Sequence, residues 1–386
     1  MGKIVAAMGT VHAPQLFTYP PTEDHKQLDA DIAAMRELGR SLDETKPDLV
    51  IVIGSDHLET FFLSSAPTFA IVGGRHSRAE FARRKYSLPI HPLAEDLLNS
   101  LVENGFDMTY SQDAVLGHAF AAVYEWVIEG RSIPVVPLFV NTYLPPLPTA
   151  QRCVLLGQAI RKVIDASDLN VAIVASGGLS HYPGTWKYPQ PAYDFDWWAI
   201  AQMERGNFGP LIRLTNHQLD QVGNTEILPW MILFGAMGPQ AGELLTYQPT
   251  WHHGHAVMRF IPNKASGPST PEPAPAWIFE NDGGYEFYRH PDPDVYPLNK
   301  VLYDLRFSPA LRRRLFEDTA GLAAEYGLTA PQATALETLK DESIDMVRSL
   351  KPHPLVDAGA HPLGMLMSLI VVQAEQRRMR KEEQSK

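Results

Sequence analysis

The sequence has a single cysteine, Cys153, among 386 residues. One thiol cannot form an intrachain disulfide, and it cannot supply a metal site built from several thiolates. Cys153 lies in an apolar, helix-like segment, where a cysteine packs as a small hydrophobe. The scarcity of cysteine is typical of a protein of the reducing cytosol.

Long apolar runs are also missing. No stretch reaches the ~18 uninterrupted apolar residues that a membrane span needs. The N-terminus enters a strand-like segment almost at once, without the basic and apolar regions of a secretory leader. We therefore expect a cytoplasmic protein.

The chain has fewer basic than acidic residues: 33 Lys and Arg and 44 Asp and Glu give a net charge of −11. This balance argues against nucleic acid or an anionic membrane as a partner. Hydrophobic residues make up 45% of the chain, which is ample for a core. The length allows one large domain and a smaller one.

Residues 1–262 alternate strand-like and helix-like segments. The alternation predicts an α/β fold with a central mixed or mostly parallel sheet and helices on both faces. After a first strand near the N-terminus, the expected strands are Asp48–Gly54, Phe69–Gly73, Ile133–Val140, Val171–Ala175, Glu243–Gln248 and Ala256–Ile261. The expected helices are Asp24–Glu44, Leu93–Glu103, Ala119–Glu129 and Ala150–Ile164, followed by a helix-rich stretch over 193–238.

The pattern changes after residue 262. Residues 263–298 begin with a Pro-rich segment that is typical of a linker and continue as an irregular connector. Residues 299–386 have helical spacing and predict a small all-α domain. Its expected helices are Ala310–Glu325, Pro331–Leu339, Ile344–Leu350 and Met365–Gln376.

Three apolar, strand-like runs each end in a small-residue turn followed by a histidine: His12, His57 and His181. Ligands of α/β sheets bind outside the carboxyl ends of the strands. Three histidines at one edge of the sheet can therefore meet in one metal or acid/base site.

A metal site of this kind needs a further ligand, and Glu226 at the head of the apolar helix 227–235 offers one. A buried carboxylate needs a partner or a metal, although acidic residues are also common at helix N-termini. Two histidines and a carboxylate form the open ligand set of non-haem Fe(II) sites and also of catalytic zinc sites. Asp56 and Glu59 are competing carboxylates beside His57, and Asp56 could instead orient a ligand histidine.

His181 follows a Ser-Gly-Gly loop and is best interpreted as a general acid/base beside the metal. A serine nucleophile is disfavoured because the loop lacks the Gly-x-Ser-x-Gly pattern. His118 begins a helix and could contact a substrate oxygen or have a structural role. The tract 252–255 contains three histidines, which could bind a metal or line the pocket.

These motifs together resemble the class III extradiol ring-cleavage dioxygenases of the protocatechuate 4,5-dioxygenase type. The matching pieces occur in family order over residues 1 to about 262, the span of the family's catalytic β subunit: His12-Ala13-Pro14, Ser55-Asp56-His57 with Phe61-Phe62, Gly117-His118, Ser176 to His181 and Asn224-Thr225-Glu226. The C-terminal segment is similar, more loosely, to the small helical α subunit of the same enzymes. A fused arrangement of this order resembles the gallate dioxygenases.

The resemblance implies that His12, His57 and Glu226 hold Fe(II), that His181 is the catalytic acid/base and that His118 contacts the substrate. It implies aromatic-compound catabolism, in which a catecholic acid such as gallate or protocatechuate is cleaved with O₂ to a ring-opened, muconate-type product. A homodimer is the family's expected assembly. The alternatives are a Zn-dependent hydrolase on the same two histidines and glutamate, or a non-enzymatic binding relative.

Overall fold

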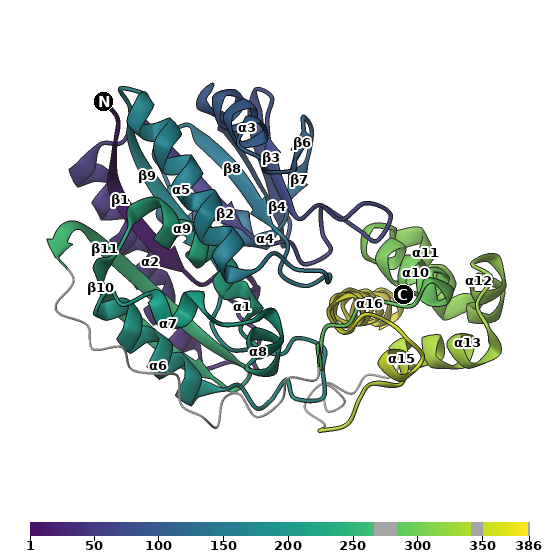
Figure 1. The fold of residues 1–386 in the computed structure, drawn as a ribbon. Helices are drawn as coiled ribbons and strands as arrows, with labels where there is room; N and C mark the ends of the chain where they lie inside the picture. Colours follow the sequence, from purple (N-terminus) through teal and green to yellow (C-terminus); the bar gives the residue numbers. More distant parts are fainter. Residues whose placement is uncertain (266–283, 341–349, 385–386) are drawn as a thin grey trace. The chain divides into compact units, whose positions relative to one another are not determined.

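The computed structural model describes residues 1–265, 284–340 and 350–384. Figure 1 shows an α/β unit and a helical unit, which confirms the predicted fold class. In the described residues the main sheet has eight strands in the order β10-β11-β1-β9-β2-β8-β3-β6. Their bounds are β1 (Lys3–Thr10), β2 (Leu49–Gly54), β3 (Phe69–Val72), β6 (Met108–Ser111), β8 (Val135–Val140), β9 (Asn170–Ser176), β10 (Gln240–Thr250) and β11 (His253–Ala265).

The middle of the sheet is parallel. Strands β1, β9, β2 and β8 pair side by side in parallel register, so their carboxyl ends lie at one edge. The pairs β1–β11, β10–β11 and β3–β8 are antiparallel, and β3–β6 is parallel. This arrangement brings the loops that follow four consecutive strands to the same end of the sheet, where ligands of α/β proteins bind.

Both faces of the sheet are covered by helices, and β2 shows why. Its residues Leu49, Ile51 and Ile53 point into one core, while Val50 and Val52 point into the other. Successive side chains of a strand alternate between faces, so a strand buried on both sides reads as one continuous apolar run. The first core contains α3 (Leu93–Glu103), α5 (Ala150–Ala166), α6 (Tyr193–Glu204) and α9 (Leu228–Met237), and the second contains α2 (His25–Thr45), α4 (His118–Ala122) and the π-helical segment Val123–Val127.

Helices α5 and α9 pack with their backbones in close approach at two glycines. A Cβ atom at Gly157 would lie 2.0 Å from the carbonyl oxygen of Ile232, and one at Gly235 would lie 2.1 Å from that of Val154. Neither position leaves room for a methyl group. Since α9 follows Glu226 directly, this contact also fixes where that carboxylate lies.

We expect Gly157→Ala to lower the free energy of unfolding by about 2 kcal/mol, because the added methyl group overpacks the contact between α5 and α9. Urea unfolding of both proteins measures the difference. Gln158→Ala changes the exposed neighbour on the same helix and serves as the control. An unchanged unfolding midpoint for Gly157→Ala would mean that the two helices separate at little cost.

The sequence did not predict the small sheet formed by β4 (His76–Phe81), β5 (Arg84–Pro89) and β7 (Val115–Leu116). Strands β4 and β5 form a hairpin whose turn residues, Ala82 and Arg83, have positive φ angles of 48° and 67°. Hairpin turns of this type normally use Asn-Gly or Asp-Gly. Without that signal, the charged hairpin could not be recognised as a pair of strands.

The helical unit consists of the described parts of Phe287–Lys386 together with two short segments, Phe62–Ser64 and Tyr182–Gln190. The expected helix Ile344–Leu350 lies outside the described residues except for its last residue, and so do residues 266–283 of the expected linker and connector. No helix among the described residues is long and apolar enough to cross a membrane. The unit contains α10 (Tyr296–Phe307), α11 (Pro309–Glu317), α12 (Thr319–Glu325), α13 (Ala330–Glu337), α15 (Pro354–Asp357) and α16 (Pro362–Gln384).

Candidate metal centre

Two of the sequence-predicted histidines converge on one carboxylate oxygen of the predicted third ligand, Glu226. His12 Nε2 lies 3.2 Å from Glu226 Oε1, and His57 Nε2 lies 2.8 Å from the same atom. His12 follows β1, His57 follows β2, and Glu226 lies in the short 3₁₀ turn Thr225–Ile227 that leads into α9. All three side chains are buried, with exposed fractions of 1%, 5% and 0%.

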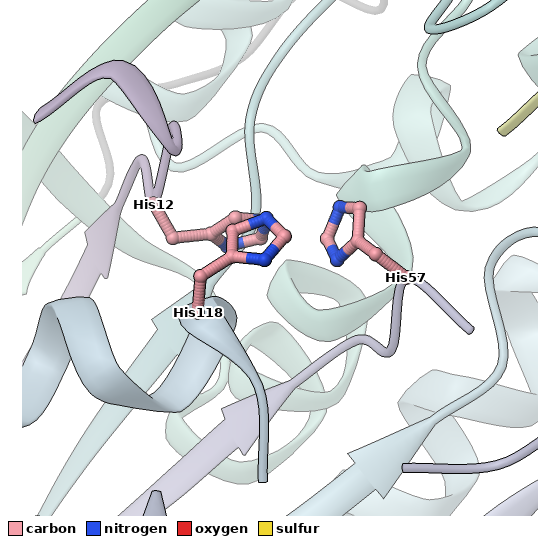
Figure 2. Close-up of side chains that lie close together, drawn as sticks. All are labelled: His12, His57 and His118. Carbon is pink, nitrogen blue, oxygen red and sulfur yellow. The ribbon is translucent and has the colours of Figure 1, made fainter. Parts of the chain in front are cut away.

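The histidines come from separate elements and gather in one place. Figure 2 shows the imidazole rings of His12, His57 and His118 pointing toward one another, from the end of a strand, from a loop and from the start of α4. The ring centres of His57 and His118 are 4.1 Å apart. Two buried groups in the described residues have ligand atoms within 4.8 Å of one another: His12, His57 and His118, and His181, Glu226 and His253.

The hydrogen bonds of His12 show that its Nδ1 carries a hydrogen. Ser176 Oγ donates to the carbonyl oxygen of Ala119 at 2.6 Å, so it accepts from His12 Nδ1 at 3.0 Å. In the neutral ring Nδ1 then carries the hydrogen, and Nε2 presents a bare lone pair to the Glu226 carboxylate. A lone pair facing a carboxylate oxygen needs a proton or a metal ion between them. The donor set therefore fits a metal ion.

The donors lie close enough to share one ion, because both imidazole Nε2 atoms are within 3.2 Å of Glu226 Oε1. The carboxylate is held in place by Ser55 Oγ, which donates to Oε1 at 2.9 Å, and by the Gly178 N–H, which donates to Oε2 at 3.0 Å.

Burial sets the charges of the centre. Burial, with a smaller contribution from the charge on His118, lowers the pKa of His57 to about 3. Burial also opposes the charged form of Glu226, but the adjacent His12 and His57 outweigh it and hold the pKa of Glu226 well below its usual range. A charged carboxylate is the form of Glu226 that metal binding requires.

His118 lies beside the centre, and Glu59 holds it through two hydrogen bonds. The carboxylate oxygen Oε2 of Glu59 accepts from His118 Nδ1 at 2.9 Å and from its backbone N–H at 3.0 Å. In the part of the chain that the structure describes, His118 Nε2 is buried without a hydrogen-bond partner. Asp56 accepts from the backbone N–H groups of Glu59, Thr60 and Phe61. Asp56 and Glu59, which the sequence offered as alternative ligands, therefore hold the loop and His118 instead.

His181 lies on the other carboxylate oxygen of Glu226. Its Nε2 is 3.6 Å from Glu226 Oε2, and its Nδ1 donates to the carbonyl oxygen of Leu179 at 2.9 Å. Burial lowers the pKa of His181 to about 4, so its ring is neutral near pH 7. The hydroxyl of Tyr143 lies 2.9 Å from Nε2, and the ring of His253 stacks on the imidazole at 3.8 Å.

The three histidines of the tract 252–255 have different surroundings. His253 contacts His181, but the other two pair with carboxylates of the N-terminal segments. His255 Nδ1 lies 2.7 Å from Asp31 Oδ2, and His252 Nε2 lies 3.4 Å from Glu23 Oε2. His253 therefore lies beside His181, whereas the buried pairs of His252 and His255 with acidic residues were not expected from the sequence.

A buried carboxylate that the sequence analysis missed supports the loop before His181. Asp196, on α6, accepts from the backbone N–H and the hydroxyl of Ser180 at 2.9 and 2.8 Å, and from the hydroxyl of Tyr247 at 2.8 Å. Burial raises the pKa of Asp196 to about 7. The fold therefore favours its neutral form over the charged one.

This shift predicts how Asp196→Asn changes stability with pH. Because the pKa in the folded state is raised, the stabilisation from the neutral carboxyl group is present below about pH 4 and is lost as the pH rises to about 7. Asparagine stays neutral, so the variant should gain roughly 3 kcal/mol relative to the wild type across this range. Urea unfolding at several pH values tests it, with the exposed Asp107→Asn as the baseline. A difference that does not change with pH contradicts the shifted pKa.

A sheet that gathers buried histidines and a carboxylate at its parallel strand ends defines a candidate metal-dependent enzyme of the two-histidine, one-carboxylate class. Residues 6–260 match the family model of the catalytic LigB subunit of aromatic ring-opening dioxygenase. The chain belongs to this family, whose members are metal-dependent, and its buried His and Glu groups could bind such a metal.

Curated relatives carry the name 2,3-dihydroxyphenylpropionate/2,3-dihydroxicinnamic acid 1,2-dioxygenase. The protein of Klebsiella pneumoniae (strain 342) is 32% identical over 158 residues, which cover 40% of this chain and 50% of the relative. The protein of Escherichia coli (strain K12 / DH10B) is 31% identical over 175 residues, which cover 45% and 55%. The chain thus spans about half the length of the curated relatives it matches. A crystal structure of an uncharacterized Escherichia coli K12 protein aligns with 16% identity and a TM-score of 0.45, over 60% of this chain and 92% of that one.

Proposed function

We propose that the chain is an Fe(II)-dependent extradiol dioxygenase that opens the ring of a catecholic aromatic acid with O₂. The observation that carries this proposal is the convergence of His12 Nε2 and His57 Nε2 on Glu226 Oε1. Two imidazoles and one carboxylate leave open positions on a six-coordinate ion. Membership of the aromatic ring-opening dioxygenase family supports the reaction class.

In this proposal His12, His57 and Glu226 hold the ion. Bound Fe(II) would supply the place where the catechol and O₂ meet and would pass electrons from the catechol to O₂. The catechol is itself the electron donor and both oxygen atoms enter the product, so the reaction needs no further reductant. The carboxylate brings one negative charge among neutral imidazoles, which favours a divalent ion and leaves the centre able to accept an anionic substrate.

His181 and His118 are proposed to act on the substrate. His181 accepts the proton of a catechol hydroxyl at Nε2, because its Nδ1–H is already bonded to the carbonyl oxygen of Leu179. It later returns the proton to an oxygen atom that comes from O₂. His118 presents its buried Nε2, which has no hydrogen-bond partner among the described residues, to a substrate oxygen.

The substrate class has two sources of support. The sequence motifs resemble enzymes of gallate and protocatechuate, whereas the curated relatives are named for 2,3-dihydroxyphenylpropionate. All three compounds carry adjacent ring hydroxyls and a carboxylate. A fused, α-subunit-like helical domain, a homodimer and a cytoplasmic location remain predictions from the resemblance and the composition.

Anaerobic reconstitution with Fe(II), followed by addition of each of the three catecholic acids and O₂, tests the proposal. We expect uptake of one O₂ per molecule of substrate and the absorbance of a ring-opened product. Absence of uptake with all three would overturn it. Zinc fits the same three ligands, so a parallel sample loaded with Zn²⁺ is needed. Air-stable hydrolysis of an ester or amide by the Zn²⁺ sample, with no O₂ uptake in either sample, would favour a zinc hydrolase. Catechol binding without turnover would favour a binding relative.

A further inference from the structure

The fourth parallel strand also delivers a residue to the site. Strand β8 ends at Val140, and Tyr143 follows three residues later, as His57 follows the end of β2. The Tyr143 hydroxyl lies 2.9 Å from His181 Nε2, and the side chain is 1% exposed. Nothing in the comparisons or in the resemblance gives this tyrosine a role.

The loop that carries Tyr143 is shaped by one side chain. Asn141 Oδ1 accepts from the backbone N–H groups of Tyr143 and Leu144 at 3.2 and 3.0 Å. Its Nδ2 donates to the carbonyl oxygen of Leu144 at 2.5 Å. Asn141 is itself buried, so the turn is rigid where the chain leaves β8. The turn formed by Asn141 therefore places the Tyr143 hydroxyl next to His181.

The direction of the hydrogen bond follows from the opposite side of the imidazole. The carbonyl oxygen of Leu179 can only accept, so His181 Nδ1 carries a hydrogen. In the neutral ring Nε2 is then bare and accepts from the Tyr143 hydroxyl. The reverse direction needs a doubly protonated, charged imidazole, which burial disfavours.

We propose that Tyr143 is a positioning residue for His181: its hydroxyl donates to Nε2 and fixes the orientation of the imidazole beside Glu226. The inference rests on the role of His181 in the proposed function. The imidazole is then fixed on three sides: by Leu179 at Nδ1, by Tyr143 at Nε2 and by the stacked ring of His253 at 3.8 Å. An imidazole held in this way needs little reorganisation when a substrate hydroxyl takes the place of the tyrosine.

Tyr143→Phe removes only the hydroxyl and keeps the buried ring. ¹⁵N-histidine NMR of the metal-free protein reads the contact directly, with the His181 resonances assigned by their loss in His181→Phe. We expect the Nε2 resonance of His181 to move downfield in Tyr143→Phe. It should stay in place in Tyr124→Phe, which removes a buried hydroxyl bonded to Ser77 instead. An unmoved resonance in Tyr143→Phe overturns the proposal.

Kinetics of the Fe(II)-loaded enzyme separate positioning from substrate binding. We expect kcat of Tyr143→Phe to fall about tenfold, a part of what general acid/base catalysis supplies, with KM changed less than about twofold. A raised KM at unchanged kcat would assign the hydroxyl to the substrate and overturn the proposal. Asn141→Ala, which releases the loop, should move the His181 resonance in the same direction as Tyr143→Phe does.

The NMR and kinetic measurements together distinguish failure of this proposal from failure of the proposed function. A shifted Nε2 resonance in a protein that consumes no O₂ with any catecholic acid would leave the Tyr143–His181 pairing standing and remove the dioxygenase assignment. An active enzyme in which Tyr143→Phe changes neither the spectrum nor kcat would do the opposite.

Discussion

Glu226→Gln is expected to lose both bound Fe(II) and turnover. Oxygen Oε1 of Glu226 is the atom on which His12 and His57 converge, and it carries the only negative charge assigned to the proposed ligand set. The nearby acids Asp56 and Glu59 are engaged with backbone N–H groups and His118, so they do not replace it. Since loss of a mere supporting contact costs 10–100-fold in metal affinity, loss of a ligand should cost at least about 100-fold.

The amide also disturbs the contacts that hold the carboxylate. Ser55 Oγ and the N–H of Gly178 both donate to Glu226, one to each oxygen. An amide has only one acceptor oxygen, so its NH₂ group must face one of these donors. We therefore expect the glutamine variant to fold with a less ordered centre, and we expect kcat to fall at least about 1,000-fold.

Elemental analysis after anaerobic loading and desalting measures the iron content of the variant. Glu226→Asp keeps the charge but shortens its reach, and it should retain part of the iron. Glu103→Gln, an exposed carboxylate on α3, is the control for the chemical change itself. A full complement of iron in Glu226→Gln would show that the ion is bound elsewhere, for example by the neighbouring group of His12, His57 and His118.

The strand-end histidines could be found from the sequence because their signal is local. His12, His57 and His181 each follow a buried apolar run, and parallel strands bring such positions together without any further information. Glu226 could be proposed because a charge heads an entirely apolar helix, which is unusual unless the charge has a partner. These arguments depend on patterns within about ten residues. The loop before His181 and the resemblance together divided the histidines into two ligands and a catalyst, and that division stays a prediction.

The contacts between distant segments could not be read from the sequence. Glu59 pairs with His118 across 59 positions, and Asp196 supports the loop before His181 from a different helix. Tyr143 has the same strand-end position as the histidines, but tyrosine is not a usual metal ligand and gave no reason to select it. Pairing across the fold depends on tertiary packing, which local propensity does not encode.

His181→Phe is expected to abolish turnover while the protein keeps its iron. The Nε2 atom of His181 faces Glu226 Oε2 at 3.6 Å, whereas the two proposed ligand histidines share Oε1. Removing the imidazole therefore leaves the three proposed ligands in place. Phenylalanine preserves a flat ring that can stack on His253, as the imidazole does at 3.8 Å. General acid/base catalysis contributes about 10²–10⁴-fold, and we expect a loss of that size in kcat.

Iron content, catechol binding and O₂ uptake must be measured together, because only their combination assigns the role. His12→Phe should lose iron and all that depends on it, whereas His181→Phe should bind iron and substrate and then fail to consume O₂. Replacing the exposed His76 with phenylalanine controls for the loss of a histidine. Near wild-type turnover in His181→Phe would contradict its assignment and leave His118, with its buried Nε2, as the remaining base beside the centre. Loss of iron would make His181 a ligand, since the same Glu226 joins it to His253 in a second possible metal group.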